Sequence, residues 1–215
     1  QLLRRQIVEH VLAVALLGLP FGIISMALVA AVQSLVFSDG GFSVLGANVL
    51  NMALVGAGLG GIVQQGLTRN TTERSAGYYS GTAAAAWLSV MLAALACSIE
   101  LAAAGTISFG KAAGAMLGTH ALIGIGEGLI TAAACFALSA RPVNASPKRS
   151  AAVPLAASGI IALMLSPFAS GYPDGLEWVA ATYDFLHEAA PALVSPLPDY
   201  SVSWISNEAL STGIA

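Results

Sequence analysis

Apolar residues follow one another in long runs along most of the chain, with short polar connections between them. Five apolar segments stand out, at residues 8–37, 43–66, 81–104, 112–139 and 152–170. Each is long enough to cross a hydrocarbon layer about 30 Å thick as a helix. Helices are favoured over barrel strands because the runs lack the alternation of barrel strands, and a helix pairs its own backbone groups in lipid. The pattern predicts an all-α fold, a polytopic transmembrane helical bundle.

The first segment is interrupted in its middle by Gly18-Leu19-Pro20-Phe21-Gly22. Proline removes a backbone donor, and the two glycines add flexible positions. We expect the segment to kink there, or to split into a short re-entrant piece and a full span.

Basic residues fall at alternate connections, which predicts the orientation of the bundle, because Lys and Arg near span ends are retained on the cytoplasmic side. They precede the first segment and follow the second and fourth: Arg4 and Arg5, Arg69 and Arg74, then Arg141, Lys148 and Arg149. The connection that holds Asp39 lies between the first two groups. The N-terminus is therefore predicted to be cytoplasmic and the C-terminal tail extracytoplasmic.

The tail changes character, since residues 171–215 carry acidic side chains and no Lys or Arg. We divide the chain into a transmembrane core, 1–170, and an acidic extracytoplasmic segment, 171–215, which could lead into a further span. A short amphipathic helix at the membrane surface is expected from Leu176 to Leu186. An extended proline segment is expected from Ser195 to Tyr200.

Composition strengthens the membrane assignment. Apolar residues make up 57% of the chain and charged residues only 9%, against about 25% charged residues in ordinary globular proteins. The lipid bilayer is the expected partner of this surface. Neither a basic nucleic-acid patch nor a nucleotide-binding loop is visible in the sequence, so no nucleic-acid partner is expected. Three glycine pairs spaced four apart are typical of close helix packing: Gly56 and Gly60, Gly114 and Gly118, Gly124 and Gly128.

Ionisable groups inside spans are candidates for function, because burying them in lipid is costly. His120 and Glu127 are seven residues apart on one face of the fourth segment, about 10 Å apart along a helix axis. Imidazole and carboxylate groups suit a borderline divalent cation. The alternative is that both make hydrogen bonds between closely packed helices.

Four further polar residues and one histidine lie within or beside the spans. Asn48 and Asn51, three residues apart, could shape a loop around a site or join helices, since amide oxygens alone are weak ligands for cobalt or nickel. His10, at the start of the first segment, is either a metal ligand or an ordinary interfacial histidine. Gln33 and Glu100 lie near span ends and are expected to be solvated.

Three passages resemble the membrane component of energy-coupling-factor transporters for cobalt and nickel, the CbiM/NikM family. The first runs from Gln33 to Gly56 and the second from His120 to Thr131. The third, Tyr172-Pro173-Asp174-Gly175-Leu176-Glu177-Trp178 followed by Ser195 to Tyr200, is similar to the PDGLE-type extracytoplasmic module.

The resemblance implies a multi-pass substrate-capture subunit of the bacterial cytoplasmic (inner) membrane. Co²⁺ or Ni²⁺ would be the transported substrate, with no bound organic cofactor. The chain would not be an enzyme, because ATP would be hydrolysed by cytoplasmic ATPase subunits, joined to it through a second transmembrane coupling protein.

The resemblance also implies a set of site residues. In the family, nitrogen donors from a Met-His N-terminus and from a histidine after the first segment hold the metal. This sequence opens at Gln1 without that start, and His10 lies roughly where the internal histidine would fall. The metal candidates are therefore His10 and His120, with Asn48, Asn51 and Glu127 as residues that shape or pack the site.

Two other functions remain open. A family member could have kept the fold and lost transport, and serve as a structural or assembly subunit of a larger membrane complex. An intramembrane enzyme would need paired catalytic groups at one depth, and only His120 and Glu127 approach that arrangement, without a nucleophile.

Overall fold

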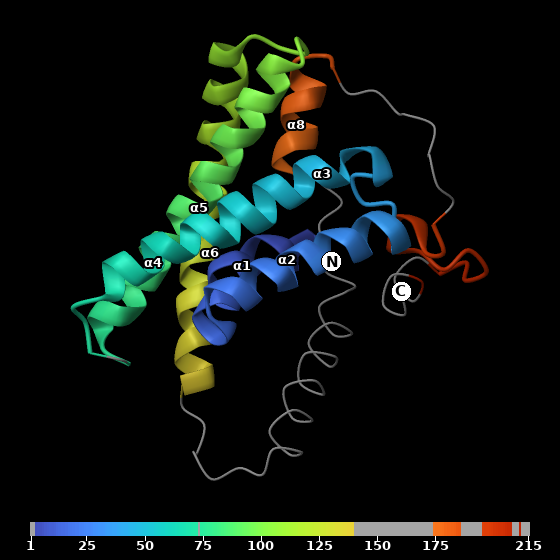
Figure 1. The fold of residues 1–215 in the computed structure, drawn as a ribbon. Helices are drawn as coiled ribbons and strands as arrows, with labels where there is room; N and C mark the ends of the chain where they lie inside the picture. The colour runs from blue at the N-terminus through green and yellow to red at the C-terminus, as the bar shows by residue number, and fades with distance from the viewer. Residues whose placement is uncertain (1–2, 73, 140–173, 186–194, 208–210, 212–215) are drawn as a thin grey trace.

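The computed structural model describes residues 3–72, 74–139, 174–185, 195–207 and 211 (Figure 1). The α-helices are α1 (Leu3–Leu17), α2 (Leu19–Val36), α3 (Leu45–Asn48), α4 (Gly60–Thr68), α5 (Ala76–Ala103), α6 (Phe109–Ser139) and α8 (Gly175–Thr182). Two short 3₁₀ turns, η1 (Phe42–Val44) and η4 (Pro198–Tyr200), and a wider π-helix, η2 (Val49–Leu59), complete the described elements. No strand occurs in these ranges, and the prediction of an all-α bundle is confirmed.

Within the described residues, four helical runs are long and apolar enough to cross a membrane, namely Leu19–Val36, Phe42–Thr68, Ala76–Ala103 and Phe109–Ala137. The last three correspond to the second, third and fourth predicted segments, with ends shifted by up to five residues. Leu19–Val36 is only the second part of the first predicted segment, which was expected to begin at residue 8. The fifth predicted segment, 152–170, lies outside the described residues. Figure 1 shows α5 and α6 side by side as one hairpin, crossed by α1, α2 and the continuous run from η1 to α4.

The first segment forms two helices that fold back on each other at Gly18. This residue has a φ of 82°, and Pro20 lies in the first turn of α2, where a missing N–H costs nothing. Beyond the turn the helices touch, since a Cβ on Gly22 would lie 2.6 Å from Cγ2 of Val14. The predicted split is confirmed, and it takes the form of an antiparallel hairpin.

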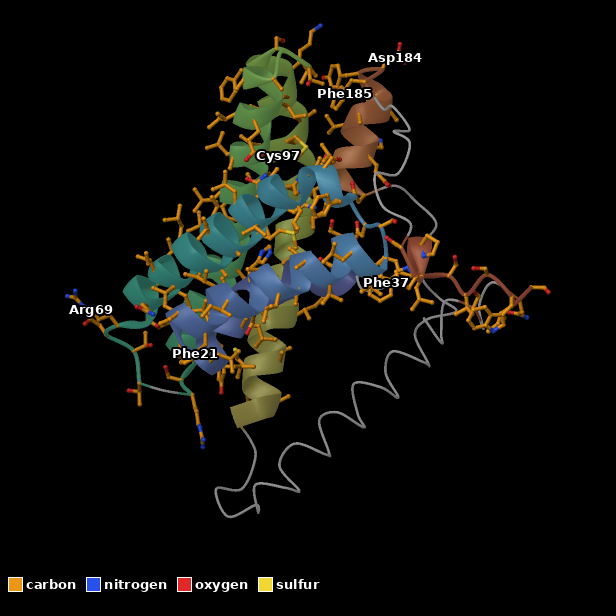
Figure 2. The ribbon with its side chains drawn as sticks, turned by 45° about the vertical axis from the view of Figure 1, so that its right-hand side comes forward. Phe21, Phe37, Arg69, Cys97, Asp184 and Phe185 are labelled. Carbon is orange, nitrogen blue, oxygen red and sulfur yellow. The ribbon has the colours of Figure 1, made fainter. Side chains whose placement is uncertain are left out.

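This hairpin corrects the predicted orientation of the N-terminus. Because α1 runs antiparallel to α2, the start of α1 lies at the end of the bundle where α2 ends and Asp39 follows. The prediction that Arg4 and Arg5 lie at the opposite end from Asp39 is therefore wrong. Figure 2 shows Phe21 and Arg69 together at the end away from Phe37, as the order of the helices requires.

Glycines allow close contact at four of the six expected positions. A Cβ on Gly128 would lie 2.7 Å from the carbonyl oxygen of Ala83, and one on Gly124 would lie 2.9 Å from the Trp87 ring. Gly56 and Gly60 on the η2–α4 run are equally close to neighbours. For Gly114 and Gly118 no described atom would lie within 4 Å of a Cβ, so close packing at these two glycines stays a prediction.

Large apolar side chains cover the outside of these helices. Phe21 and Leu28 on α2 and Leu122 and Leu129 on α6 are all more than 60% exposed. Water would be a poor solvent for such a surface, and a bilayer is a good one. The exposed faces therefore fit the assignment of the bundle to the membrane.

The acidic C-terminal segment contacts the core in two places. At the first, α8 packs through Val179 on Ala94 of α5 and Met116 of α6, and Asp174 and Glu177 form a capping box at its start. The helix predicted from Leu176 to Leu186 is confirmed, although it ends at Thr182.

The second contact of the C-terminal segment with the core involves Ser195–Tyr200. The prediction of an extended conformation is wrong for Pro198–Tyr200. These residues form a 3₁₀ turn, closed by a hydrogen bond from Ser201 N–H to the Pro198 carbonyl.

Candidate metal centre

His10 lies where α1, η2 and α5 meet. Its side chain is only 5% exposed, and a Cβ on Gly56 would lie 2.8 Å from its Nδ1 atom. Ser89 of α5 donates a hydrogen bond of 2.9 Å to the carbonyl oxygen of Gly56, which draws the three elements together. Among the described residues, neither ring nitrogen of His10 has a hydrogen-bond partner. A buried imidazole without hydrogen-bond partners is costly. The arrangement therefore suits a bound group that is held by a ring nitrogen of His10.

Asn48 and Asn51 contact different parts of the molecule. The amide of Asn48 packs on the connection after α2, since a Cβ on Gly40 would lie 2.6 Å from its Nδ2 atom. Asn51 donates a hydrogen bond of 2.8 Å from Nδ2 to Oε2 of Glu100 on α5. One asparagine therefore supports a loop, and the other joins η2 to α5.

His120, on α6, lies at the junction between the core and α8. It does not share the surroundings of His10, which lies among α1, η2 and α5. Its Nδ1 atom is 2.8 Å from the carbonyl oxygen of Met116, one turn earlier on α6. A Cβ on Gly175, the first residue of α8, would lie 2.6 Å from the His120 ring. The imidazole is thus in direct contact with the start of the C-terminal helix.

Glu127 is buried on α6, with 6% of its surface exposed, and its Oε2 atom has no hydrogen-bond partner within the described ranges. The neighbouring Gly128 packs directly on α5. This places Glu127 on the side of α6 that belongs to the bundle interior.

Gln33 was expected to be solvated, and that expectation is wrong. Its side chain is only 4% exposed, because the C-terminal segment covers the end of α2. The only sequence signal was a polar side chain in the last turn of an apolar segment. Glu100 is half-buried and accepts the bond from Asn51.

The described side chains hold no cluster of three or more His, Cys, Asp or Glu residues with the spacing of a metal site. Within the same part of the chain, the geometry offers one buried histidine whose ring nitrogens make no hydrogen bond, at the crossing of three membrane helices.

Comparison with known families identifies the core. Residues 8–145 match the family model described as the cobalt uptake substrate-specific transmembrane region, CbiM. The chain belongs to this family. The CbiM match runs from residue 8 within α1 to beyond the end of α6, and it includes all five candidate site residues.

The C-terminal part matches a second model, the PDGLE domain, over residues 148–215. The CbiM and PDGLE matches follow each other directly along the chain. The contact of His120 with Gly175 thus joins a residue of the CbiM region to one in the PDGLE region.

Two curated proteins are similar in sequence to this chain. A protein of Archaeoglobus fulgidus, named as a fused nickel transport protein NikMN, is 36% identical over 200 residues, which cover 89% of this chain and 65% of that protein. A protein of Haloquadratum walsbyi, named as a metal transport protein, is 37% identical over 131 residues, 59% of this chain and 57% of that protein. The chain thus spans less than two thirds of either relative's length. No solved structure matches the chain.

Proposed function

We propose that this CbiM-family membrane protein is the substrate-capture component of a cobalt or nickel uptake transporter. The divalent cation is the transported substrate. In this proposal the core, residues 1–170, captures the metal within the cytoplasmic membrane, and the acidic segment from 171 onward lies on the outer side. A second membrane protein and cytoplasmic ATPase subunits would couple capture to ATP hydrolysis.

The observation that carries the proposal is the state of His10. Its ring is enclosed by three helices and makes no hydrogen bond among the described residues. Imidazole nitrogen is a good ligand for Co²⁺ and Ni²⁺, and a poor one for the abundant hard cations Mg²⁺ and Ca²⁺. A single buried histidine does not complete a coordination sphere, so further nitrogen donors must join it.

His120 takes a different role in the proposal. Its Nδ1 atom already faces a backbone carbonyl, and its ring supports the first residue of α8. We assign His120 to the contact between the core and the PDGLE region, and Glu127 to packing inside the bundle. Asn48, at the end of α3, packs on the loop after α2, and Asn51 joins η2 to α5. Together they fix the helical run against which His10 rests.

Equilibrium metal binding to the full-length protein, purified in detergent, tests this assignment. We expect His10→Gln to weaken Ni²⁺ and Co²⁺ binding by at least about tenfold, since even the loss of an outer-shell partner costs that much. Glutamine keeps a polar side chain at the position but removes the imidazole. His120→Gln is the matched control, and its metal affinity should stay close to that of the unmodified protein.

Two results would contradict the proposal. Equal affinities in all three proteins would remove His10 from the site. Absence of measurable Co²⁺ or Ni²⁺ binding by the unmodified protein would instead favour a transport-inactive assembly subunit.

A further inference from the structure

The connection after α2 is held from inside the core. Asp39 N–H donates to the Gln33 carbonyl at 3.1 Å, and the Ser34 hydroxyl donates to the Gly41 carbonyl at 2.7 Å. Asn48 packs against Gly40 from the other side. These contacts give residues 37–41 a defined shape at the end of the bundle.

The same connection is held from outside by Ser195–Tyr200, which we call the latch. The Ser38 hydroxyl donates to the Ser195 hydroxyl at 2.7 Å, and Leu197 N–H donates to the Val36 carbonyl at 3.0 Å. The Tyr200 hydroxyl donates to Oδ2 of Asp39 at 2.7 Å. The Tyr200 ring stacks on Phe37 with 4.4 Å between ring centroids. Figure 2 shows Phe37 pointing toward this part of the C-terminal segment.

The latch covers the polar groups at this end of α2. Gln33 is 4% exposed and Ser34 is 1% exposed, and the Gln33 amide lies beside the Tyr200 phenol. Burial, and then the hydrogen bond to Asp39, raise the pKa of Tyr200 above its ordinary value. The phenol therefore stays protonated at neutral pH and keeps its donor for Asp39.

The covered groups lie close to His10 along the helix axis. In the antiparallel hairpin, Leu12 and Ala13 of α1 lie near Met26 and Val29 of α2. Together with the contact of Gly22 with Val14, this register puts Gln33 between one and two helical turns beyond the part of α2 that faces His10. Gln33 and Ser34, the buried polar side chains of α2, thus lie between His10 and Asp39 along the helix axis.

Other parts of α2 offer a cation no comparable route. Its exposed side chains include Leu28, Val32 and Leu35, which a bilayer would cover. The polar end of the helix is the place where a hydrated cation meets oxygen and nitrogen groups on the way to His10.

We propose that the latch closes the route by which a divalent cation reaches His10 and must leave Asp39 and Gln33 before the cation can pass. This rests on the proposed function. A latch that covers both the empty and the loaded site slows binding and release equally. It therefore changes the rate of metal association and leaves the equilibrium affinity unchanged.

Locking the latch tests the proposal. Ser38→Cys combined with Ser195→Cys places two thiols where the hydroxyl oxygens are now 2.7 Å apart, so oxidation can join them. In the full-length protein, we expect the oxidised double variant to bind Ni²⁺ at least about tenfold more slowly, as for other gated sites. Reduction followed by alkylation should restore the rate without leaving free thiols that bind metal. Each single cysteine variant, treated in the same way, is the control.

Weakening the latch should have the opposite effect. Tyr200→Phe keeps the stacking on Phe37 and removes the hydrogen bond to Asp39. We expect Ni²⁺ to associate roughly threefold to tenfold faster, as expected for the loss of one hydrogen bond, with unchanged equilibrium affinity. Tyr183→Phe, on an exposed tyrosine at the end of α8, is the matched control and should bind at the unmodified rate.

The outcomes separate the two proposals. If the unmodified protein binds Ni²⁺ and the locked variant binds it equally fast, the latch proposal is wrong and the proposed function stands. A lower affinity in Tyr200→Phe with an unchanged association rate would make Tyr200 a structural support and would also overturn the latch. If the unmodified protein binds neither metal, both proposals fail.

Discussion

At the scale of single residues, the glycine opposite His10 decides where the imidazole lies. Gly56 leaves the space that a side chain would take, since a Cβ there would be 2.8 Å from Nδ1 and 3.0 Å from Cε1 of His10. The ring therefore rests directly on the η2 backbone. A small displacement of the ring would move the coordinating nitrogen atom away from a bound cation.

Substitution of this glycine tests the importance of the ring position. Gly56→Ala should push the His10 ring away from η2 and weaken Ni²⁺ binding by roughly tenfold to 100-fold, the range seen when the support of a ligand is lost. Gly58→Ala, two residues later, is the control, because its Cβ would lie 3.5 Å from Ile23, an ordinary contact. Isothermal titration of both variants measures the effect, and equal affinities would show that the ring position is not critical.

The sequence allowed His10 to be selected as a candidate. It did not predict which residues surround the imidazole ring. A lone histidine near the start of an apolar run is compatible with an interface as well as with a buried site. The burial of Gln33 was beyond sequence reasoning for a related reason, because the residue that covers it, Tyr200, lies far along the chain. Local hydropathy carries no information about such distant contacts.

At the scale of helices, α5 and α6 pack closely along each other. Trp87 donates a hydrogen bond of 3.0 Å from its indole to the Ala121 carbonyl. Gly128 lies against the backbone of Ala83. A backbone atom cannot rotate away from an added side chain, as the end of a flexible side chain could. Close backbone contact is how membrane helices associate when the surrounding lipid is as apolar as their side chains.

Gly128→Ala should separate this hairpin and destabilise the protein by about 1–3 kcal/mol, as overpacking of a well-packed interior does. Gly126→Ala lies two residues earlier on the same helix with no described atom within 4 Å of the added Cβ, so it should leave stability unchanged. Thermal unfolding in detergent measures both. Similar midpoints for the two variants would mean that the α5–α6 contact is looser than described.

Helix positions were largely predictable, because length and apolar composition are local properties of the sequence. The segments predicted at 43–66, 81–104 and 112–139 match described helical runs within a few residues. The direction of the chain after Gly18 was not predictable in the same way. The Gly18-Leu19-Pro20 interruption permits a kink or a reversal, and the contact of Gly22 with Val14 distinguishes the two.

At the scale of the whole molecule, the number of crossings determines which connections share a side. If Phe42–Thr68 and Ala76–Ala103 both cross the bilayer, the connection at 37–41 and the one at 104–108 must lie on the same side. The C-terminal segment contacts the first of these through Tyr200 and Asp39, so it lies on that side too. The connection between α4 and α5 lies on the other.

Labelling single cysteines in sealed vesicles tests this arrangement. Thr106→Cys and Ser203→Cys should react with a membrane-impermeant thiol reagent from one side, and Thr72→Cys from the opposite side only. All three positions are exposed, so access of the reagent depends on sidedness rather than burial. Reaction of all three from one side would contradict the crossing pattern.

The position of the latch on the same polypeptide as its docking surface has a further consequence. Re-docking of Ser195–Tyr200 is a unimolecular step. The fraction of molecules with the latch docked is therefore set by an effective concentration and not by the amount of protein in the membrane. Short tethers commonly give effective concentrations in the millimolar range. A few hydrogen bonds and one stacked ring pair are then sufficient to keep the surface occupied, and a free peptide of the same sequence would compete only at comparable concentrations.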